Sequence, residues 1–109
     1  MPKIWPAGEG SVKMTIRLKL FPPLSDTAGV SEMDLTLGDP ADIRSVVDAL
    51  VSRFGPAMER HLFDRSGKVI PSWAVFLNRK IYPLNQPDSL SARVHAGDDV
   101  SFILNIAGG

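Results

Sequence analysis

The chain has 109 residues, of which 44% are hydrophobic and 22% charged, and this is ordinary for one globular domain with a single core. Lysine plus arginine equals aspartate plus glutamate, so no charge excess points to nucleic acid or an anionic membrane as a partner. The absence of cysteine excludes a disulfide, a thiolate metal site and a persulfide on the chain's own side chains.

Motifs for catalysis or cofactor binding are also missing from the sequence. The two histidines, His61 and His95, are far apart in sequence. His61 has no carboxylate at a useful spacing and His95 lies in a turn, so neither is expected to be catalytic. There is no phosphate-binding loop, dinucleotide-binding glycine motif or nucleophile elbow. We expect no metal, no cofactor bound by this chain, and chemistry that uses the backbone terminus or belongs to a partner. Without a signal-like N-terminus or an apolar run near about 18 residues, we expect no membrane association and a cytoplasmic location.

The N-terminal half begins without periodicity and then alternates. Residues 1–12 carry two prolines and two glycines, and they are expected to be a flexible extension. From Lys13 to Phe21 apolar and polar residues alternate, which predicts a half-buried strand with Phe21 on its exposed face. After a loop over residues 24–31, a second alternating run predicts a strand that forms a hairpin with the first: Met33, Leu35 and Leu37.

The clearest helix follows this second strand. Asp39 is the expected N-cap, and Pro40 suits the first turn. The sequence Gly55-Pro56 predicts the end of the helix. Between them, apolar residues recur at helical spacing, which predicts a helix lying across the sheet: Ile43, Val46, Val47, Leu50, Val51 and Phe54.

The second half contains three further strand-like runs. Residues 57–72 are less regular, with a short helical turn. Trp73–Leu77 is expected to be a third strand, and Ile81–Tyr82 a short fourth one. A loop or helical turn follows, and Gly97 then suits a positive φ angle in the turn that leads into the final strand, which ends at Leu104.

The sequence ends on two glycines, Gly108-Gly109, after Ile106-Ala107. Glycines give a tail without side chains, able to enter a narrow channel and adopt backbone angles that other residues avoid. Four extended residues span roughly 13–14 Å, which would carry the Gly109 carboxylate into a partner's active site. The alternative interpretation is a frayed terminus.

The order of these elements, with the last strand leading into Gly-Gly, resembles the ubiquitin-like β-grasp fold. More closely, it resembles the sulfur-carrier family that includes the molybdopterin synthase small subunit and the thiamine-biosynthesis carrier. The resemblance covers Lys13 to Gly109 and rests on Leu20-Phe21, Leu77-Asn78, Gly97-Asp98-Asp99-Val100 and the terminal glycines. Residues 60–64 and 75–78 are most similar to the carriers of cysteine biosynthesis. Leu104-Asn105 departs from the family, because many relatives have prolines there.

The resemblance implies an α+β fold with a mixed four- to five-stranded sheet and one main helix packed across it. The domain would span residues 13–105, with an extended tail over residues 106–109. It also implies a carrier rather than an enzyme. An adenylating enzyme of the E1 type would use ATP to activate Gly109, with Gly108 as the slender residue that enters its channel. A sulfur donor would then give a C-terminal thiocarboxylate, which a sulfur-accepting synthase consumes. The pathway stays open between molybdopterin, thiamine and cysteine.

Alternation along the last strand predicts where partners dock. If Val100, Phe102 and Leu104 face the core, Ser101 and Ile103 face outward. An apolar patch beside Arg17 and Lys19 is then expected to bind partners together with the tail; its residues are Phe21, Ile81 and Ile103, and those of the tail are Ile106 and Ala107. Two other functions remain open: a protein modifier that forms isopeptide bonds through Gly109, and a β-grasp interaction domain whose glycines are incidental.

Overall fold

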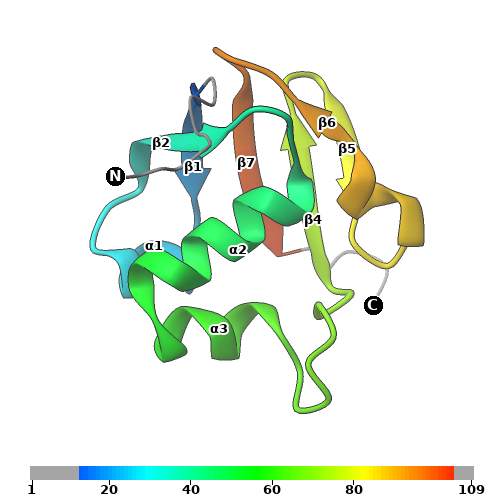
Figure 1. Ribbon diagram of the computed structural model, residues 1–109. Coiled ribbons are helices and arrows are strands. Elements are labelled where there is room, and N and C mark those ends of the chain that lie inside the picture. Colours follow the sequence, from blue (N-terminus) through cyan, green and yellow to red (C-terminus); the bar gives the residue numbers. More distant parts are fainter. Residues whose placement is uncertain (1–12, 105–109) are drawn as a thin grey trace, which may run out of the picture.

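The computed structural model describes residues 13–104 (Figure 1). The expected extension over residues 1–12 and the tail over residues 106–109 lie outside the described residues, as does Asn105. In chain order the elements are β1 (Lys13–Leu20), α1 (Leu24–Ala28), β2 (Glu32–Gly38), β3 (Ala41–Asp42), α2 (Ile43–Phe54), α3 (Pro56–Leu62), β4 (Trp73–Leu77), β5 (Lys80–Pro83), the 3₁₀ helix η1 (Pro87–Ser91), β6 (Arg93–Val94) and β7 (Asp99–Leu104).

The main sheet has five strands in the order β2-β1-β7-β4-β5. β1 pairs antiparallel with β2 and parallel with β7, while β4 pairs antiparallel with both β7 and β5. Two short strands, β3 and β6, form a separate pair. The helices cover one face of the main sheet (Figure 1). This confirms the α+β β-grasp architecture with a mixed sheet and one main helix across it, as the sequence predicted.

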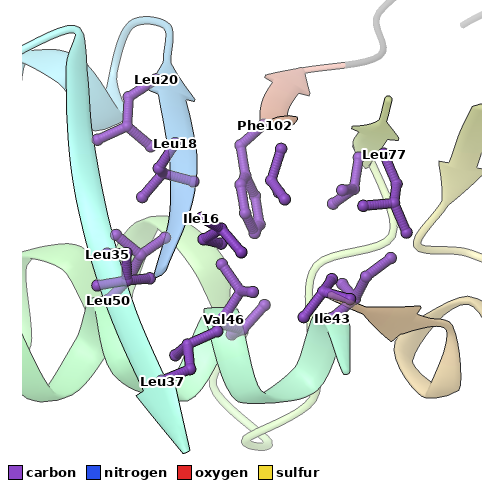
Figure 2. Packing of buried hydrophobic residues seen from close by; sticks show 14 of the residues in the cluster. Ile16, Leu18, Leu20, Leu35, Leu37, Ile43, Val46, Leu50, Leu77 and Phe102 are labelled. Atoms are coloured by element: carbon purple, nitrogen blue, oxygen red, sulfur yellow. The ribbon is translucent and has the colours of Figure 1, made fainter. Parts of the chain in front are cut away.

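The core lies between the sheet and α2, because both elements present one apolar side. The side chains of β1 alternate between exposed and buried along its whole length. From α2, Ile43, Val46 and Leu50 are completely buried and meet inward side chains of the sheet such as Phe102 (Figure 2). Complete burial of one such side chain is worth about 1.5–3 kcal/mol, so this interface is the main source of stability.

Two predictions for the first half of the chain were wrong. The loop expected over residues 24–31 contains α1, which one completely buried side chain, Leu24, anchors to the core. The N-cap of α2 is Asp42 and not Asp39, because Ala41 is buried and Ala41–Asp42 pairs with β6 first. The Asp42 carboxylate accepts the backbone N–H of Ser45 at 2.9 Å, and the Ser45 hydroxyl accepts the backbone N–H of Asp42 at 3.2 Å. This reciprocal pair is a capping box.

The less regular stretch before β4 contains a full helix, α3, instead of a short turn. Gly55, at a φ of 80°, ends α2 and starts α3, so the predicted helix stop is confirmed. Two side chains of α3, Met58 and Leu62, are completely buried. The indole N–H of Trp73, the first residue of β4, donates to the carbonyl oxygen of His61 over 2.7 Å. α3 is thereby attached to the central part of the sheet.

Candidate functional site

The face of the sheet away from the helices changes from charged to apolar along the strands. Strand register shows this, because residues paired across neighbouring strands lie side by side on the same face. At the start of β7, Asp99 lies beside Arg17, which in turn lies beside Asp34. Two residues further along β7, one row crosses the whole sheet: Glu32, Lys19, Ser101, Phe76 and Ile81.

The apolar end of this face lies where β1 and β7 both finish, since these two strands are parallel. Beyond the last β1–β7 pair the chain continues to Phe21 on one strand and Ile103 on the other. Ile103 pairs with Ala74, and Ala74 pairs with Pro83. We call the outward side chains at this end the apolar patch: Phe21, Phe76, Ile81 and Ile103.

Large apolar side chains of the patch are exposed in the isolated protein. Phe21 is 46% exposed, Ile81 is 48% exposed and Phe76 is 39% exposed, while Ile103 is partly exposed. Leu104, the last residue of β7, is 38% exposed. The expected inward orientation holds for Val100 and Phe102, which are completely buried, but Leu104 extends beyond the core. Contiguous exposed apolar side chains of this kind mark interaction surfaces.

Sequence reasoning named Phe21, Ile81 and Ile103 as docking residues, and the structure brings all three to one face. Their role in binding stays a prediction. It missed Phe76, although the signal was present in the sequence. In a strand from Trp73 to Leu77, alternation places Phe76 on the side opposite Trp73, Val75 and Leu77. The other predicted site residues lie outside the described residues: Ile106, Ala107, Gly108 and Gly109.

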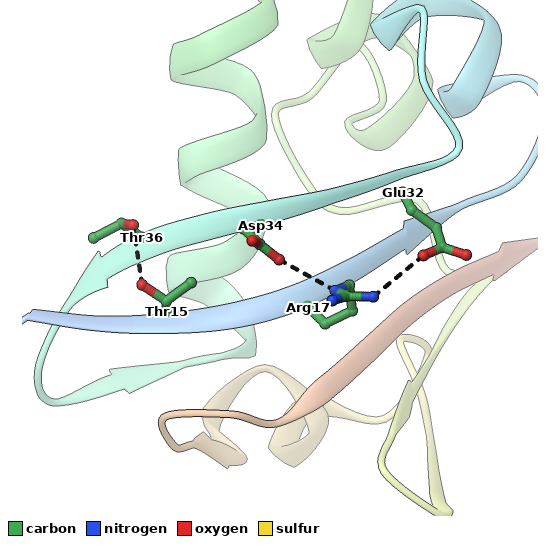
Figure 3. Close-up of polar contacts among 5 residues, drawn as sticks. All are labelled: Thr15, Arg17, Glu32, Asp34 and Thr36. Carbon is green, nitrogen blue, oxygen red and sulfur yellow. Dashed lines mark hydrogen bonds and ion pairs between the residues drawn. The ribbon is translucent and has the colours of Figure 1, made fainter.

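Ion pairs and hydrogen bonds fill the β1–β2 side of the same face (Figure 3). Arg17 donates from Nε to Asp34 over 3.1 Å and from Nη1 to Glu32 over 3.4 Å. The hydroxyls of Thr15 and Thr36 are 3.2 Å apart. All these groups are exposed, so the ion pairs contribute little to stability, about 0–1 kcal/mol each. Arg17, Asp34 and Glu32 together carry a formal charge of −1, so this part of the face is polar and charged.

Each histidine contacts a polar group within the described residues, and the His95 ring Nδ1 lies 3.8 Å from the Asp98 carboxylate. His61 Nε2 lies 3.0 Å from the hydroxyl of Thr27 and joins α3 to α1. The backbone N–H of His95 donates to the Asp98 carboxylate over 2.8 Å, so Asp98 caps the turn before β7. In residues 13–104 no three His, Asp or Glu side chains gather as a metal site. No helix of that region is long and apolar enough to cross a membrane.

The helical side of the molecule carries a separate pocket of about 310 Å³ between α2, α3 and the loop that follows α3. In the wall of the pocket, the Arg44 guanidinium lies 5.3 Å from the centre of the Phe63 ring. Arg44 Nε donates to the Asp48 carboxylate over 3.1 Å. No residue predicted from the sequence to act in function lines this pocket. Its lining residues are Arg44, Asp48, Val51, Ser52, Glu59, Phe63 and Gly67.

The sheet order and the helix that crosses the sheet define a ubiquitin-like β-grasp fold. Three solved structures are similar to this chain over most of its length. SAMP1 of Haloferax volcanii, a small archaeal modifier protein, is 25% identical with a TM-score of 0.71, over 87% of this chain and 99% of that one. A putative molybdopterin converting factor subunit 1 of Pyrococcus furiosus is 16% identical with a TM-score of 0.62, over 85% and 99%.

A chain of the BexX/CysO complex of Amycolatopsis orientalis is 19% identical with a TM-score of 0.61, over 86% of this chain and 99% of that one. No protein-family model and no curated protein matches the sequence. The ubiquitin-like β-grasp fold expected from the resemblance is therefore confirmed, across nearly the whole length of these neighbours.

Proposed function

We propose that this protein is a sulfur carrier whose C-terminal Gly109 is adenylated and then converted to a thiocarboxylate. The chain acts as a co-substrate of partner enzymes, and those enzymes supply the nucleotide binding and the catalytic groups. The recipient pathway is one of sulfur-dependent biosynthesis, of molybdopterin, thiamine or cysteine.

One observation carries the proposal: β7, which leads to the terminal glycines, is an interior strand of the sheet and is held on both sides. It pairs with β1 as far as Phe102 and with β4 as far as Leu104. Only four residues separate Leu104 from Gly109 in the sequence. The apolar patch flanks the same end of β7. A partner that covers the patch therefore binds beside the point from which the chain continues toward its reactive carboxylate.

The chemistry requires activation, because a free carboxylate has no good leaving group. The Gly109 carboxylate oxygen attacks the α-phosphorus of ATP, a new P–O bond forms, and pyrophosphate leaves. Hydrosulfide, or an equivalent sulfur donor on a partner, then attacks the carbonyl carbon of the acyl-adenylate. A C–S bond forms, the C–O bond to AMP breaks, and AMP leaves with the electron pair. The resulting thiocarboxylate is a soft nucleophile that a sulfur-accepting synthase can consume.

Glycine at the last two positions suits this chemistry for a steric reason. A tail without side chains passes through a narrow channel and permits backbone angles that a Cβ atom would forbid. Gly109 carries the reacting carbon, and Gly108 lets it reach the nucleotide. Ile106 and Ala107 would contact the walls of the channel, while the patch holds the domain outside.

The test is mass spectrometry of the intact chain with the adenylating enzyme of the same cell, ATP and a sulfide donor. We expect an AMP adduct at Gly109 without sulfide and replacement of one terminal oxygen by sulfur when sulfide is added. A chain lacking Gly109 serves as the control and should acquire neither. An unmodified wild-type chain, or a native chain that continues beyond Gly109, would refute the proposal.

A second candidate function is protein modification, and the likeness to SAMP1, described as a modifier protein, favours it. The first step is the same, but a lysine amine of a target protein attacks the acyl-adenylate and forms an isopeptide bond. Protein purified from its native cells discriminates between the two. Terminal sulfur supports the carrier, whereas adducts of higher mass linked through lysine support the modifier. If neither occurs and partner binding survives deletion of Gly109, an interaction domain is the remaining function.

A further inference from the structure

We propose that Lys19 is a specificity-determining contact of the docking face, and that its ammonium group pairs with a carboxylate on the adenylating enzyme. This inference rests on the proposed function, since it concerns the enzyme that must bind the unmodified chain. The inference goes beyond the proposed function because it states the charge that the partner presents at the border of the apolar patch.

The first step of the argument is the difference between the two cations of β1. Arg17 and Lys19 lie on the same face, two residues apart. Arg17 contacts both carboxylates of β2, Asp34 at 3.1 Å and Glu32 at 3.4 Å (Figure 3). In residues 13–104 no carboxylate lies within ion-pairing distance of Lys19, although Glu32 is its partner in strand register. Within residues 13–104, Lys19 thus has no ion pair, whereas Arg17 has two.

The second step is the position of Lys19 relative to the patch. It lies beside Ser101, which lies beside Phe76. Phe21 follows two residues later on the same side of the chain. Lys19 therefore lies between the charged residues on the β1–β2 side of the face and the apolar patch. A partner large enough to cover Phe76 and Phe21 would also cover the ammonium group of Lys19.

On the β5 side of the patch, the lysine of the strand lies on the other face of the sheet. Lys80 is paired with Leu77, whose side chain faces the core, so Lys80 belongs to the helix side of β5. Its ammonium nitrogen lies 5.3 Å from the centre of the Tyr82 ring on that same side. Of the lysines on β1 and β5, Lys19 is therefore the one at the patch that lies on its outward face without an ion pair in residues 13–104, and a complementary partner needs its carboxylate on the β1 border. A charge of this kind at the rim of an apolar interface sets orientation and association rate more than total affinity.

The experiment compares two lysines of one strand face. Lys19→Glu and Lys13→Glu change the net charge equally, but Lys13 lies six residues away, roughly 20 Å along the strand. The full-length variants are titrated against the adenylating enzyme, and KM for the chain and kcat for adenylation are measured separately. In about 50 mM salt, Lys19→Glu should raise KM about five- to tenfold with kcat unchanged, because it places like charges opposite each other. Lys13→Glu should stay within about twofold of the wild type.

Salt provides the second readout. In about 0.5 M salt the KM difference between Lys19→Glu and the wild type should shrink to about twofold or less, since a rim ion pair is screened. Lys19→Gln, which removes the charge without reversing it, should give a smaller increase than Lys19→Glu. Thermal unfolding of Lys13→Glu and Lys19→Gln should match the wild type, because these side chains are exposed, while Lys19→Glu should unfold at a slightly lower temperature, since it places a carboxylate opposite Glu32.

The outcomes separate the two proposals. If the wild type is adenylated but both Glu variants have the same KM, the role of Lys19 is refuted and the proposed function stands. A lower KM for Lys19→Glu would show that the partner is basic at this border, and it would also overturn the inference. If the wild-type chain never acquires AMP, the proposed function fails, and this inference fails with it.

Discussion

The side-chain amide of Asn78 donates to the carboxylate of Asp98 over 3.2 Å and joins the β4–β5 turn to the turn before β7. The amide oxygen of Asn78 accepts the backbone N–H of Asp99 at 3.0 Å, and the backbone N–H of Asn78 donates to the Asp99 carbonyl at 2.8 Å. On the other side, the backbone N–H of Arg17 donates to the Asp98 carbonyl at 2.9 Å. The start of β7 is thus fixed to both neighbouring strands. This gives a physical reason why Leu77-Asn78 and Gly97-Asp98 carry the family resemblance together.

The first prediction concerns Asn78, which has a left-handed φ of 57°. Asn78→Ala removes both side-chain hydrogen bonds. The alanine keeps a Cβ atom, which disfavours the left-handed φ angle, and has no polar group to compensate. We expect a loss of about 1–3 kcal/mol in the free energy of unfolding, measured by urea denaturation. Asn78→Gly removes the same contacts but adopts the φ angle easily, so it should cost less than Asn78→Ala. Equal stability of all three proteins would contradict this account.

The parts of the fold with a long, regular pattern could be predicted from sequence. The alternation of β1 and the apolar stripe of α2 each extend over several repeats, so tertiary contacts reinforce what the local pattern indicates. α1 could not be recognised in this way, because a five-residue helix with one buried side chain, Leu24, has no periodicity to detect. The pair β3–β6 involves only two residues on each strand, and its partners are far apart in sequence.

The second prediction tests the start of α2, where Asp39 was the expected N-cap and Asp42 is the observed one. Asp42→Ala removes the carboxylate that accepts the Ser45 N–H and should lower stability by about 0.5–2 kcal/mol. Asp39→Ala is the matched control, since Asp39 is exposed and precedes β3, and it should change stability by less than about 0.5 kcal/mol. Thermal denaturation of both variants gives the comparison, and a larger effect of Asp39→Ala would restore the original N-cap assignment.

The third prediction concerns the bond from Trp73 to α3. Trp73→Phe keeps a large aromatic ring at a site that is only 2% exposed, but it leaves the His61 carbonyl without its 2.7 Å donor. We expect a loss of about 1–3 kcal/mol on chemical denaturation. His61→Ala retains the backbone carbonyl and loses only the contact with Thr27, so it should cost less. A larger loss for His61→Ala than for Trp73→Phe would show that the indole bond contributes little.

The fourth prediction is a pH effect in the loop after α3. The Ser66 hydroxyl, and then the backbone N–H groups of Lys68 and Ser66, hold the pKa of Asp64 below its ordinary value. Because the folded state has the lower pKa, the loop's contribution to stability is present above the ordinary Asp range. It is lost as the pH falls through the lowered pKa. NMR titration of the Asp64 carboxyl should give a midpoint below that of an unstructured Asp, and Ser66→Ala should raise it. An unchanged midpoint in Ser66→Ala would remove the assigned cause.

The candidate site could be predicted only where alternating apolar and polar residues show which face of a strand each side chain occupies. Phe21 and Ile103 were assigned to the outward face because each lies in an alternating strand next to buried neighbours. Phe76 lies in a run of five apolar residues, Trp73–Leu77, where hydrophobicity alone does not distinguish the two faces. The rows across the sheet depend on strand order and register, and these follow from pairing between segments that are distant in the chain.

The fifth prediction follows from the central position of Phe76 in the apolar patch. Phe76→Ser and Ile81→Ser should each raise KM for the chain in adenylation by about five- to fiftyfold, because central apolar contacts contribute most to an interface. Phe76 is 39% exposed and Ile81 is 48% exposed, so both variants should stay folded with a moderate loss in the free energy of unfolding, which is measured beside KM. Thr36→Ala, on the same face at the β2 edge, is the control and should leave KM within about twofold. If kcat falls while KM is unchanged in the two Ser variants, the patch does not dock the activating enzyme and must influence the position of the tail instead.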